Sequence, residues 1–319
     1  MPSTFHPARG LEHPHAQTIF ASLLRGRRIP LLRRERLRTP DGDFVDVDVL
    51  PAPEGAPRLL LLHGLEGSSD SGYVREQLRL AQANGWGAWA LNFRGCSGVP
   101  NLQAYSYNSG DWADAHFVAS LMRERHPSSR LFASGYSLGG SVLLNLLARP
   151  EAKGLIDAAA AVSVPFDLSG CADLLDTAGG IGSVYRVRFM RTLRVKGLEK
   201  ARRWPELLNA ERISRISTIR GFDDVVTGPL GGFRDAADYY AQSSTGPKLG
   251  RVTTPTLLLT AGDDPLAPAS HLPANAAENQ ALTVELTEAG GHCGFVAGTR
   301  LSPSWWGEAR VFAHFETQL

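Results

Sequence analysis

One serine of the chain lies in a sequence suited to nucleophilic catalysis, Gly135-Tyr136-Ser137-Leu138-Gly139. This G-x-S-x-G pattern forms a sharp turn between a strand and a helix, and the turn holds the serine hydroxyl above the sheet. The flanking residues suit such a turn, because 131–134 have the pattern of a short strand and 138–148 that of an apolar helix. The helix N-terminus would favour negative charge beside the serine. We therefore predict that Ser137 is a catalytic nucleophile.

A serine hydroxyl is a poor nucleophile near neutral pH, so it needs a histidine base that is oriented by an acid. When a G-x-S-x-G turn supplies the serine, the acid and then the histidine follow on loops after later strands. Asp263-Asp264-Pro265 follows a predicted strand at 256–260, and Gly290-Gly291-His292 follows one at 282–286. Both loops would lie at the carboxyl ends of parallel strands, where such sheets bind ligands. We predict that His292 is the base.

Two adjacent aspartates are candidates for the acid that orients this histidine. Asp264 lies four residues before Pro268, which is the usual spacing between such an acid and a proline in this loop. We therefore favour Asp264. Asp263 is the alternative, and if it is not the acid we expect it to cap the turn or to face solvent.

Attack of a serine on a carbonyl creates an oxyanion, which two backbone N–H groups can stabilise. The turn at the serine supplies one of them, the N–H of Leu138. The loop after a predicted strand at 58–62, His63-Gly64-Leu65, supplies a flexible turn for the second, which we assign to Leu65. We expect His63 to orient this loop by side-chain hydrogen bonding and not to act as the base.

The segments that would position these residues alternate between strands and helices. Four consecutive leucines at 59–62 predict a strand buried on both faces. Alternation of apolar and acidic residues at 44–49 predicts a half-buried strand in a hairpin. Further strands are predicted at 88–93, 131–134, 158–164, 256–260 and 282–286, and helices at 71–84, 112–125, 138–148 and 304–315. This order predicts an α/β fold, with a mostly parallel sheet and helices on both of its faces.

Residues 166–250 interrupt the alternation. They are rich in arginine and lysine, have a mostly helical pattern and contain no strong strand signal. We predict that they form a helical cap inserted into a core made of residues 1–165 and 251–319. The first 30 residues are expected to be an irregular N-terminal arm, and the basic run at 25–38 a solvated edge or a lid over the fold.

The composition argues against several other classes of protein. The 319 residues include 33 Lys+Arg and 32 Asp+Glu, and a net charge of +1 argues against binding to nucleic acid or to an anionic membrane. Three scattered cysteines and the lack of metal-binding motifs give no reason to expect a disulfide framework, a catalytic metal or another cofactor. No segment has the character of a membrane span or a signal peptide, so we expect a cytoplasmic protein.

Together, these motifs resemble those of the YheT-like branch of the α/β-hydrolase superfamily, which contains serine ester hydrolases. The resemblance extends over about residues 15–296. It is most specific in Arg94-Gly95-Cys96-Ser97-Gly98 and in Phe222-Asp223-Asp224. The other matching segments are His15-Ala16-Gln17-Thr18-Ile19, residues 39–44, 63–69, 92–93, 135–140, 239–240, 263–265 and 290–295.

The resemblance implies an α/β-hydrolase fold and a carboxylic-ester hydrolase that uses Ser137, the Asp263-Asp264 acid and His292. It also implies small-molecule ester substrates, either lipid-like or with short to medium acyl chains. One departure is Asn108, which stands where the pattern of the family leads us to expect a histidine. Two alternatives remain, a non-catalytic binding or scaffold protein on the same fold and an acyltransferase. The sequence leaves open the oligomeric state and the preference among ester, thioester and amide substrates.

Overall fold

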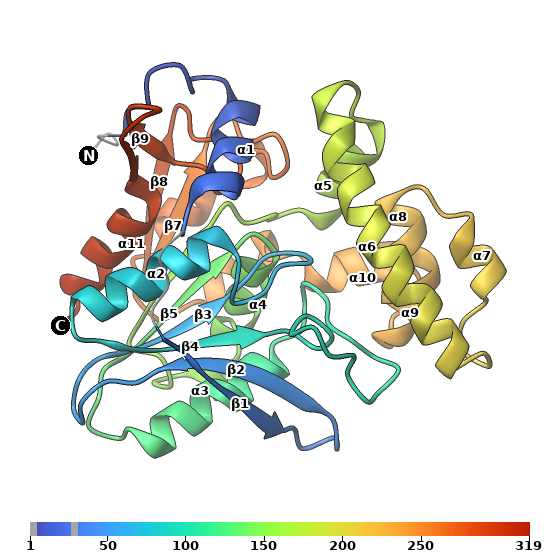
Figure 1. Ribbon diagram of the computed structural model, residues 1–319, viewed down its shortest axis with the longest axis horizontal. Coiled ribbons are helices and arrows are strands. Elements are labelled where there is room, and N and C mark those ends of the chain that lie inside the picture. The colour runs from blue at the N-terminus through green and yellow to red at the C-terminus, as the bar shows by residue number, and fades with distance from the viewer. Residues whose placement is uncertain (1–4, 27–30) are drawn as a thin grey trace.

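The computed structural model describes residues 5–26 and 31–319, and over these residues its main sheet has eight strands (Figure 1). Their order is β1-β2-β4-β3-β5-β6-β7-β8. β2 pairs antiparallel with β1 and β4, and the other neighbours pair in parallel. The strands are β1 (Arg33–Arg38), β2 (Phe44–Leu50), β3 (Arg58–Leu62), β4 (Gly87–Asn92), β5 (Leu131–Tyr136), β6 (Ala158–Val162), β7 (Thr256–Ala261) and β8 (Leu282–Thr287).

Helices cover both faces of this sheet, which confirms the predicted fold class. α3 and α4 share one apolar cluster with the sheet, and α2 and α11 share another on the opposite face. A small separate sheet joins β9 (Val296–Gly298) to β10 (Pro303–Trp305). The four helices are α2 (Gly72–Ala83), α3 (Ala113–Arg125), α4 (Leu138–Leu147) and α11 (Trp306–Glu316).

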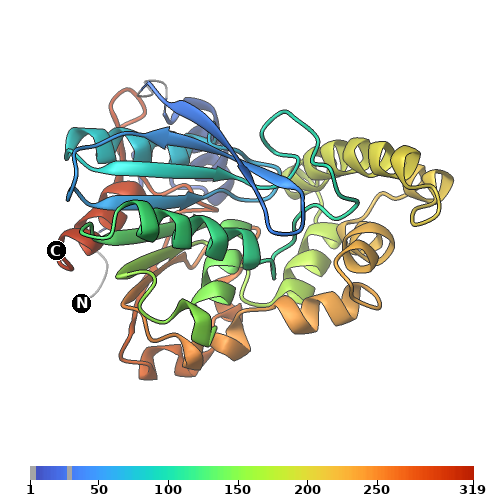
Figure 2. The same cartoon turned by 90° about the horizontal axis from the view of Figure 1, so that it is seen from below.

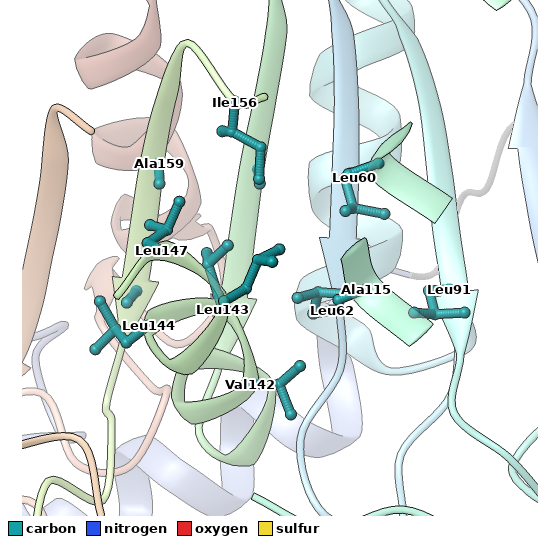
Figure 3. Packing of buried hydrophobic residues seen from close by; sticks show 14 of the residues in the cluster. Leu60, Leu62, Leu91, Ala115, Val142, Leu143, Leu144, Leu147, Ile156 and Ala159 are labelled. Carbon is teal, nitrogen blue, oxygen red and sulfur yellow. The ribbon is translucent and has the colours of Figure 1, made fainter. Parts of the chain in front are cut away.

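The leucine run of β3 is buried on both faces, as the sequence predicts. Leu60 and Leu62 belong to the cluster under α4, whereas Leu59 and Leu61 belong to the cluster under α2 and α11. Successive side chains of a strand point to opposite faces, so an unbroken apolar run suits a central strand with helices on both sides. Figure 3 shows the α4 side of this core, where Val142 points toward Leu62.

Between β6 and β7 the chain leaves the sheet and forms a group of helices, which Figure 2 shows at one end of the molecule. Residues 166–250 contain no strand. The apolar side chains of these helices form a cluster of their own, apart from the two clusters at the sheet. This separate cluster supports the predicted cap insertion. We name as cap helices α5 (Leu168–Thr177), α6 (Ile181–Arg203), α7 (Ala210–Ser214), α8 (Ile219–Phe222), α9 (Gly228–Leu230) and α10 (Ala236–Ser243).

The N-terminal arm contains a helix, so the prediction of an irregular segment is wrong. α1 (Pro14–Leu24) begins after His13, whose side chain accepts a hydrogen bond from the N–H of His15. Pro14 suits the first helical position, because its fixed φ matches the helix and it has no N–H to satisfy. The buried side of the helix includes the polar Gln17. A polar residue on the buried side weakens the apolar periodicity by which a helix is predicted.

The basic run ends in the edge strand β1, and this part of the run confirms the expected solvated edge. Most of its side chains are exposed, and only Leu37 is buried. Residues 27–30 of the run lie outside the described residues. At the start of the run the prediction is wrong, because Arg25 is buried and paired with Glu308. In the parts of the chain that the structure describes, no helix has both the length and the apolar character needed to cross a membrane.

β2 is buried along its whole length, so the prediction of a half-buried strand is wrong. Its two acidic residues are paired with arginines of β1. Asp48 accepts hydrogen bonds of 2.8 and 2.7 Å from Arg34, and Asp46 accepts bonds of 2.8 and 2.9 Å from Arg36. Burial alone would raise the pKa of both carboxyls, but these partners lower it. A carboxylate can be buried when it is paired and hydrogen-bonded, which a polar-outward pattern does not anticipate.

Candidate active site

Ser137 lies in a sharp turn between β5 and α4. Its backbone has φ 54° and ψ −121°, a conformation that residues other than glycine rarely adopt. The glycines around it are required by close packing. A Cβ at Gly139 would lie 2.4 Å from the carbonyl oxygens of both Leu62 and His63, and a Cβ at Gly135 would lie 2.3 Å from the carbonyl oxygen of Gly139. The turn therefore leaves the serine half-buried, while Gly139 packs tightly against the end of β3 and Gly135 against the start of α4.

The three side chains predicted from the order of the loops lie in contact. Ser137 Oγ is 2.9 Å from His292 Nε2, and His292 Nδ1 is 2.9 Å from Asp264 Oδ2. Asp264 is also held by the N–H groups of Leu266 and Ala267, at 2.8 and 2.9 Å. A histidine that donates its Nδ1 proton to the carboxylate has Nε2 free to accept a proton from the serine.

The charge of Asp264 determines how readily His292 takes up a proton. Burial by itself would lower the pKa of His292, but the adjacent Asp264 carboxylate outweighs burial and raises the pKa well above its usual value. A base with a raised pKa accepts the serine proton more readily, provided that it is still neutral at the working pH.

The two adjacent aspartates have different partners. Asp263 accepts a hydrogen bond of 2.8 Å from the N–H of Gly291, next to the histidine in the sequence, whereas Asp264 contacts the imidazole itself. The pKa of Asp263 is raised, mainly by burial. These contacts support Asp264 as the acid and suggest that Asp263 holds the backbone of the histidine loop.

The backbone groups assigned to the oxyanion hole are available for a ligand. Over the described residues, neither the N–H of Leu65 nor that of Leu138 has a hydrogen-bond acceptor. Leu138 is the first residue of α4, and the first N–H groups of a helix have no partner within it. Both leucines line the same cavity as Ser137 and His292. This arrangement supports the predicted role of the two N–H groups.

His63 is a buried structural residue, as the sequence analysis expects. Its Nδ1 donates to the carbonyl oxygen of Gly64 at 2.8 Å, and its Nε2 accepts from the N–H of Phe93 at 3.1 Å. The ring is fully buried, and burial lowers its pKa to about 4. A neutral ring can make both of these hydrogen bonds, which join the end of β3 to the end of β4.

Sequence reasoning missed a polar network that joins the cap to the loop of Leu65. Lys196 of α6 donates to Glu66 at 2.8 Å, and the hydroxyl of Tyr107 donates to the same carboxylate oxygen at 2.8 Å. The N–H of Glu66 donates in turn to the Tyr107 hydroxyl at 2.9 Å. The backbone and the side chain of Glu66 are therefore both held, directly after Leu65. Segments this distant in the sequence give no local signal of contact.

A cavity between the sheet and the cap helices opens onto Ser137. Its volume is about 160 Å³, and its walls are mostly apolar. Polar groups at its wall include Asp223, whose pKa burial raises to about 6 and whose Oδ2 accepts a 2.7 Å hydrogen bond from Tyr240. The apolar wall includes Leu168, Leu175, Phe189, Leu193, Phe222, Val226 and Leu230. An apolar cavity beside a nucleophile can hold a hydrocarbon chain next to the reacting carbonyl.

Asn108, the departure from the expected histidine, has a local structural role. Its Oδ1 accepts from the N–H of Gly110 at 2.7 Å, and its Nδ2 donates to the Tyr105 hydroxyl at 3.3 Å. Within residues 5–26 and 31–319, no group of three or more His, Cys, Asp and Glu side chains could hold a metal ion.

Comparison with known proteins identifies the family. The family described as the alpha/beta hydrolase fold matches residues 57–299. The chain is also 37% identical over 312 residues to a protein of Escherichia coli (strain K12) that is named "Putative esterase YheT". That match covers 96% of this chain and 91% of YheT. The chain belongs to the α/β hydrolases. The resemblance to the YheT-like branch of the α/β hydrolases is thereby confirmed.

Other relatives of this α/β hydrolase carry names of lipid-processing enzymes. It is 27% identical over 305 residues to phospholipase ABHD3 of Mus musculus. That alignment covers 92% of this chain and 74% of the phospholipase. It is 29% identical over 286 residues to the monoacylglycerol lipase of Saccharomyces cerevisiae. That alignment covers 87% of this chain and 62% of the lipase.

Solved structures agree with the fold of this α/β hydrolase. The Pyrococcus furiosus esterase Pf2001 superposes with a TM-score of 0.57 at 14% sequence identity, over 90% of this chain and 92% of the esterase. At this low identity the similarity establishes the fold alone.

Proposed function

We propose that this α/β hydrolase is a serine carboxylic-ester hydrolase with Ser137, His292 and Asp264 as its catalytic triad. Its relatives are named as an esterase, a phospholipase and a monoacylglycerol lipase, all of which are enzymes that act on ester bonds. The chain is therefore an ester-bond hydrolase. The observation that carries the triad is the continuous chain of contacts from Ser137 Oγ through the imidazole to Asp264, with distances of 2.9 and 2.9 Å.

The reaction proceeds through an acyl-enzyme. His292 Nε2 removes the proton of Ser137 as Oγ attacks the ester carbonyl, and the N–H groups of Leu65 and Leu138 stabilise the oxyanion. The imidazolium then donates its proton to the leaving alcohol, and the acyl group stays on the serine. A water molecule, deprotonated by His292, attacks the acyl-enzyme and releases the carboxylic acid, and the imidazolium returns its proton to Ser137 Oγ as the acyl–oxygen bond breaks. Asp264 stabilises the imidazolium in both halves of the reaction.

The cavity supports a small-molecule ester with an apolar acyl chain as the substrate. Its volume of about 160 Å³ is similar to that of apolar cavities that bind a benzene-sized ligand. We therefore infer acyl chains of medium length, on the order of six to eight carbons, in esters that can be lipid-like. The absence of nucleic-acid binding and the cytoplasmic location stay predictions from composition.

The triad is tested with a fluorophosphonate probe, which forms a stable adduct with an activated serine. We expect one adduct per chain, on Ser137, and none in the folded Ser137→Ala variant. Well-folded protein without an adduct would contradict the triad and favour a non-catalytic binding protein.

The substrate is tested with p-nitrophenyl esters of increasing chain length. We expect kcat/KM to be highest at about six to eight carbons, because the apolar wall stabilises the bound chain. Turnover of the acetate ester alone would contradict the lipid-like assignment. Acyl products formed mainly from an added alcohol, instead of water, would identify an acyltransferase.

A further inference from the structure

Helix α1 packs against the loop that carries His292 (Figure 1). Thr18 Oγ1 accepts a hydrogen bond of 2.9 Å from the backbone N–H of His292, while its own hydroxyl proton goes to the carbonyl oxygen of Pro14 at 2.9 Å. The neighbouring Gln17 is fully buried. Its Oε1 accepts from the N–H of Val296 at 2.6 Å, and its Nε2 donates to the carbonyl oxygen of the same residue at 3.0 Å. α1 thus holds this loop at both of its ends.

The residue that follows α1 holds the middle of the loop. Arg25 Nη2 donates to the carbonyl oxygens of Cys293, at 2.8 Å, and Gly294. Its Nη1 donates to Glu308 of α11 at 2.6 Å, and both side chains of this ion pair are buried. The guanidinium is therefore fixed by α11 and in turn fixes the peptide groups that follow Cys293 and Gly294.

The loop has a backbone that needs such support. Cys293 and Phe295 have φ values of 53° and 46°, in the left-handed region that disfavours residues with a side chain. Conformations of this kind persist only when surrounding contacts over-determine them. α1 contacts the backbone at His292 and Val296, and Arg25 contacts the carbonyl oxygens of Cys293 and Gly294 between them. Together these contacts stabilise the strained path that directs the imidazole toward Ser137.

The packing between α1 and the loop leaves no space for a larger side chain in the loop. A Cβ at Gly291 would lie 2.4 Å from the carbonyl oxygen of Pro14 and 2.7 Å from Thr18 Oγ1. A Cβ at Gly294 would lie 2.9 Å from the Cβ of Gln17. The histidine loop is therefore in direct contact with the helix on either side of His292.

We propose that residues 14–25 form a positioning arm for the catalytic histidine, in which Thr18 is the main positioning residue. This inference rests on the proposed role of His292 as the base. Thr18 does not line the cavity, so its effect on catalysis passes through His292 and not through the substrate. The geometry that matters is the alignment of His292 Nε2 with Ser137 Oγ, and misplacement of a reacting group by about 1 Å can lower a rate by about 100-fold.

The proposal is tested by kinetics of Thr18→Val, which has nearly the same shape but no hydroxyl. We expect kcat to fall by about 10-fold to 100-fold with KM changed less than about twofold, because the cavity is untouched while the base is misaligned. Thr18→Ser keeps the acceptor and should restore most of kcat. Ser22→Ala is the matched control, because it removes an exposed hydroxyl from α1 that donates only to the carbonyl oxygen of Ile19.

Hydrogen exchange provides a second measurement that does not depend on activity. Amides of residues 290–296 should exchange faster in Thr18→Val than in the wild type and in Ser22→Ala. If Thr18→Val does not fold, Thr18→Ala serves in its place, since alanine suits a helix.

The outcomes separate this inference from the proposed function. Wild-type kcat and unchanged exchange in a folded Thr18→Val variant would overturn the positioning arm, even if Ser137 is labelled by the fluorophosphonate. A fall in kcat that serine fails to rescue would also overturn the role of the hydroxyl. Wild-type protein that is neither labelled nor active would instead refute the proposed function, and the exchange experiment would still show whether the arm holds the loop.

Discussion

At the scale of residues, the clearest distinction is between the two adjacent aspartates after β7. They have the same chemistry and neighbouring positions, yet only Asp264 contacts the imidazole of His292, while Asp263 accepts from the backbone N–H of Gly291. An asparagine at 263 could still accept that backbone hydrogen bond. An asparagine at 264 could not stabilise the imidazolium, and its amide could hold the wrong tautomer of the ring.

The prediction at this scale compares Asp264→Asn with Asp263→Asn. We expect kcat on a p-nitrophenyl ester to fall by about 10⁴-fold in Asp264→Asn and by less than about 10-fold in Asp263→Asn. Steady-state kinetics measure both losses, and urea unfolding shows whether each variant is folded. Similar losses in the two variants, or a larger loss at 263, would reverse the assignment of the acid.

At the scale of elements, the turn at Ser137 depends on how closely the start of α4 approaches the end of β3. The carbonyl oxygens of Leu62 and His63 lie 2.4 Å from the position of a Cβ at Gly139, and neither oxygen can move without moving the strand. The serine turn, the loop of Leu65 and the central strand therefore form one packed unit. This is why glycine is required there although Gly139 takes no part in the chemistry.

The prediction for these elements is that Gly139→Ala is destabilising. We expect the free energy of unfolding to fall by about 1–3 kcal/mol, because the added methyl group overpacks a rigid backbone contact. Urea unfolding measures the change. Gly250→Ala is the control, since no atom lies within 4 Å of the added Cβ, and it should change stability by less than about 0.5 kcal/mol. Equal stability of the two variants would show that the turn tolerates a side chain.

At the scale of the whole molecule, stability depends on titratable groups that folding buries in particular charge states. Burial lowers the pKa of His63 to about 4. The unfolded chain binds a proton at His63 below about pH 6.5, whereas the folded chain binds it only below about pH 4. The contribution of His63 to the free energy of unfolding is therefore fully present above about pH 6.5, and it is lost as the pH falls toward about 4.

The prediction at this scale compares the wild type with His63→Gln, which cannot titrate. The difference in unfolding free energy between the two should shrink as the pH falls from about 6.5 to about 4, by on the order of 3 kcal/mol. Urea unfolding at several pH values measures it. A constant difference between the wild type and His63→Gln would show that the buried ring is not held neutral.

Most of the alternation of strands and helices in the core, and the loops that carry Ser137, Asp264 and His292, could be predicted from the sequence. These features are local. Four leucines predict the central strand of the sheet, two glycines predict the serine turn, and parallel strands bring their carboxyl ends to one edge. The YheT-like family could be predicted for the same reason, since its motifs are short segments.

The surroundings of those residues could not be predicted, because they come from distant segments that meet only in the folded chain. Thr18 and His292 are 274 positions apart, and Lys196 and Glu66 are 130 apart, so no periodicity relates them. Gln17 and Asp48 are polar residues in buried positions, which a pattern of apolar residues assigns to the surface. Burial of such a residue is favourable only with a hydrogen-bonding partner, and a partner from a distant segment exists only after the chain has folded.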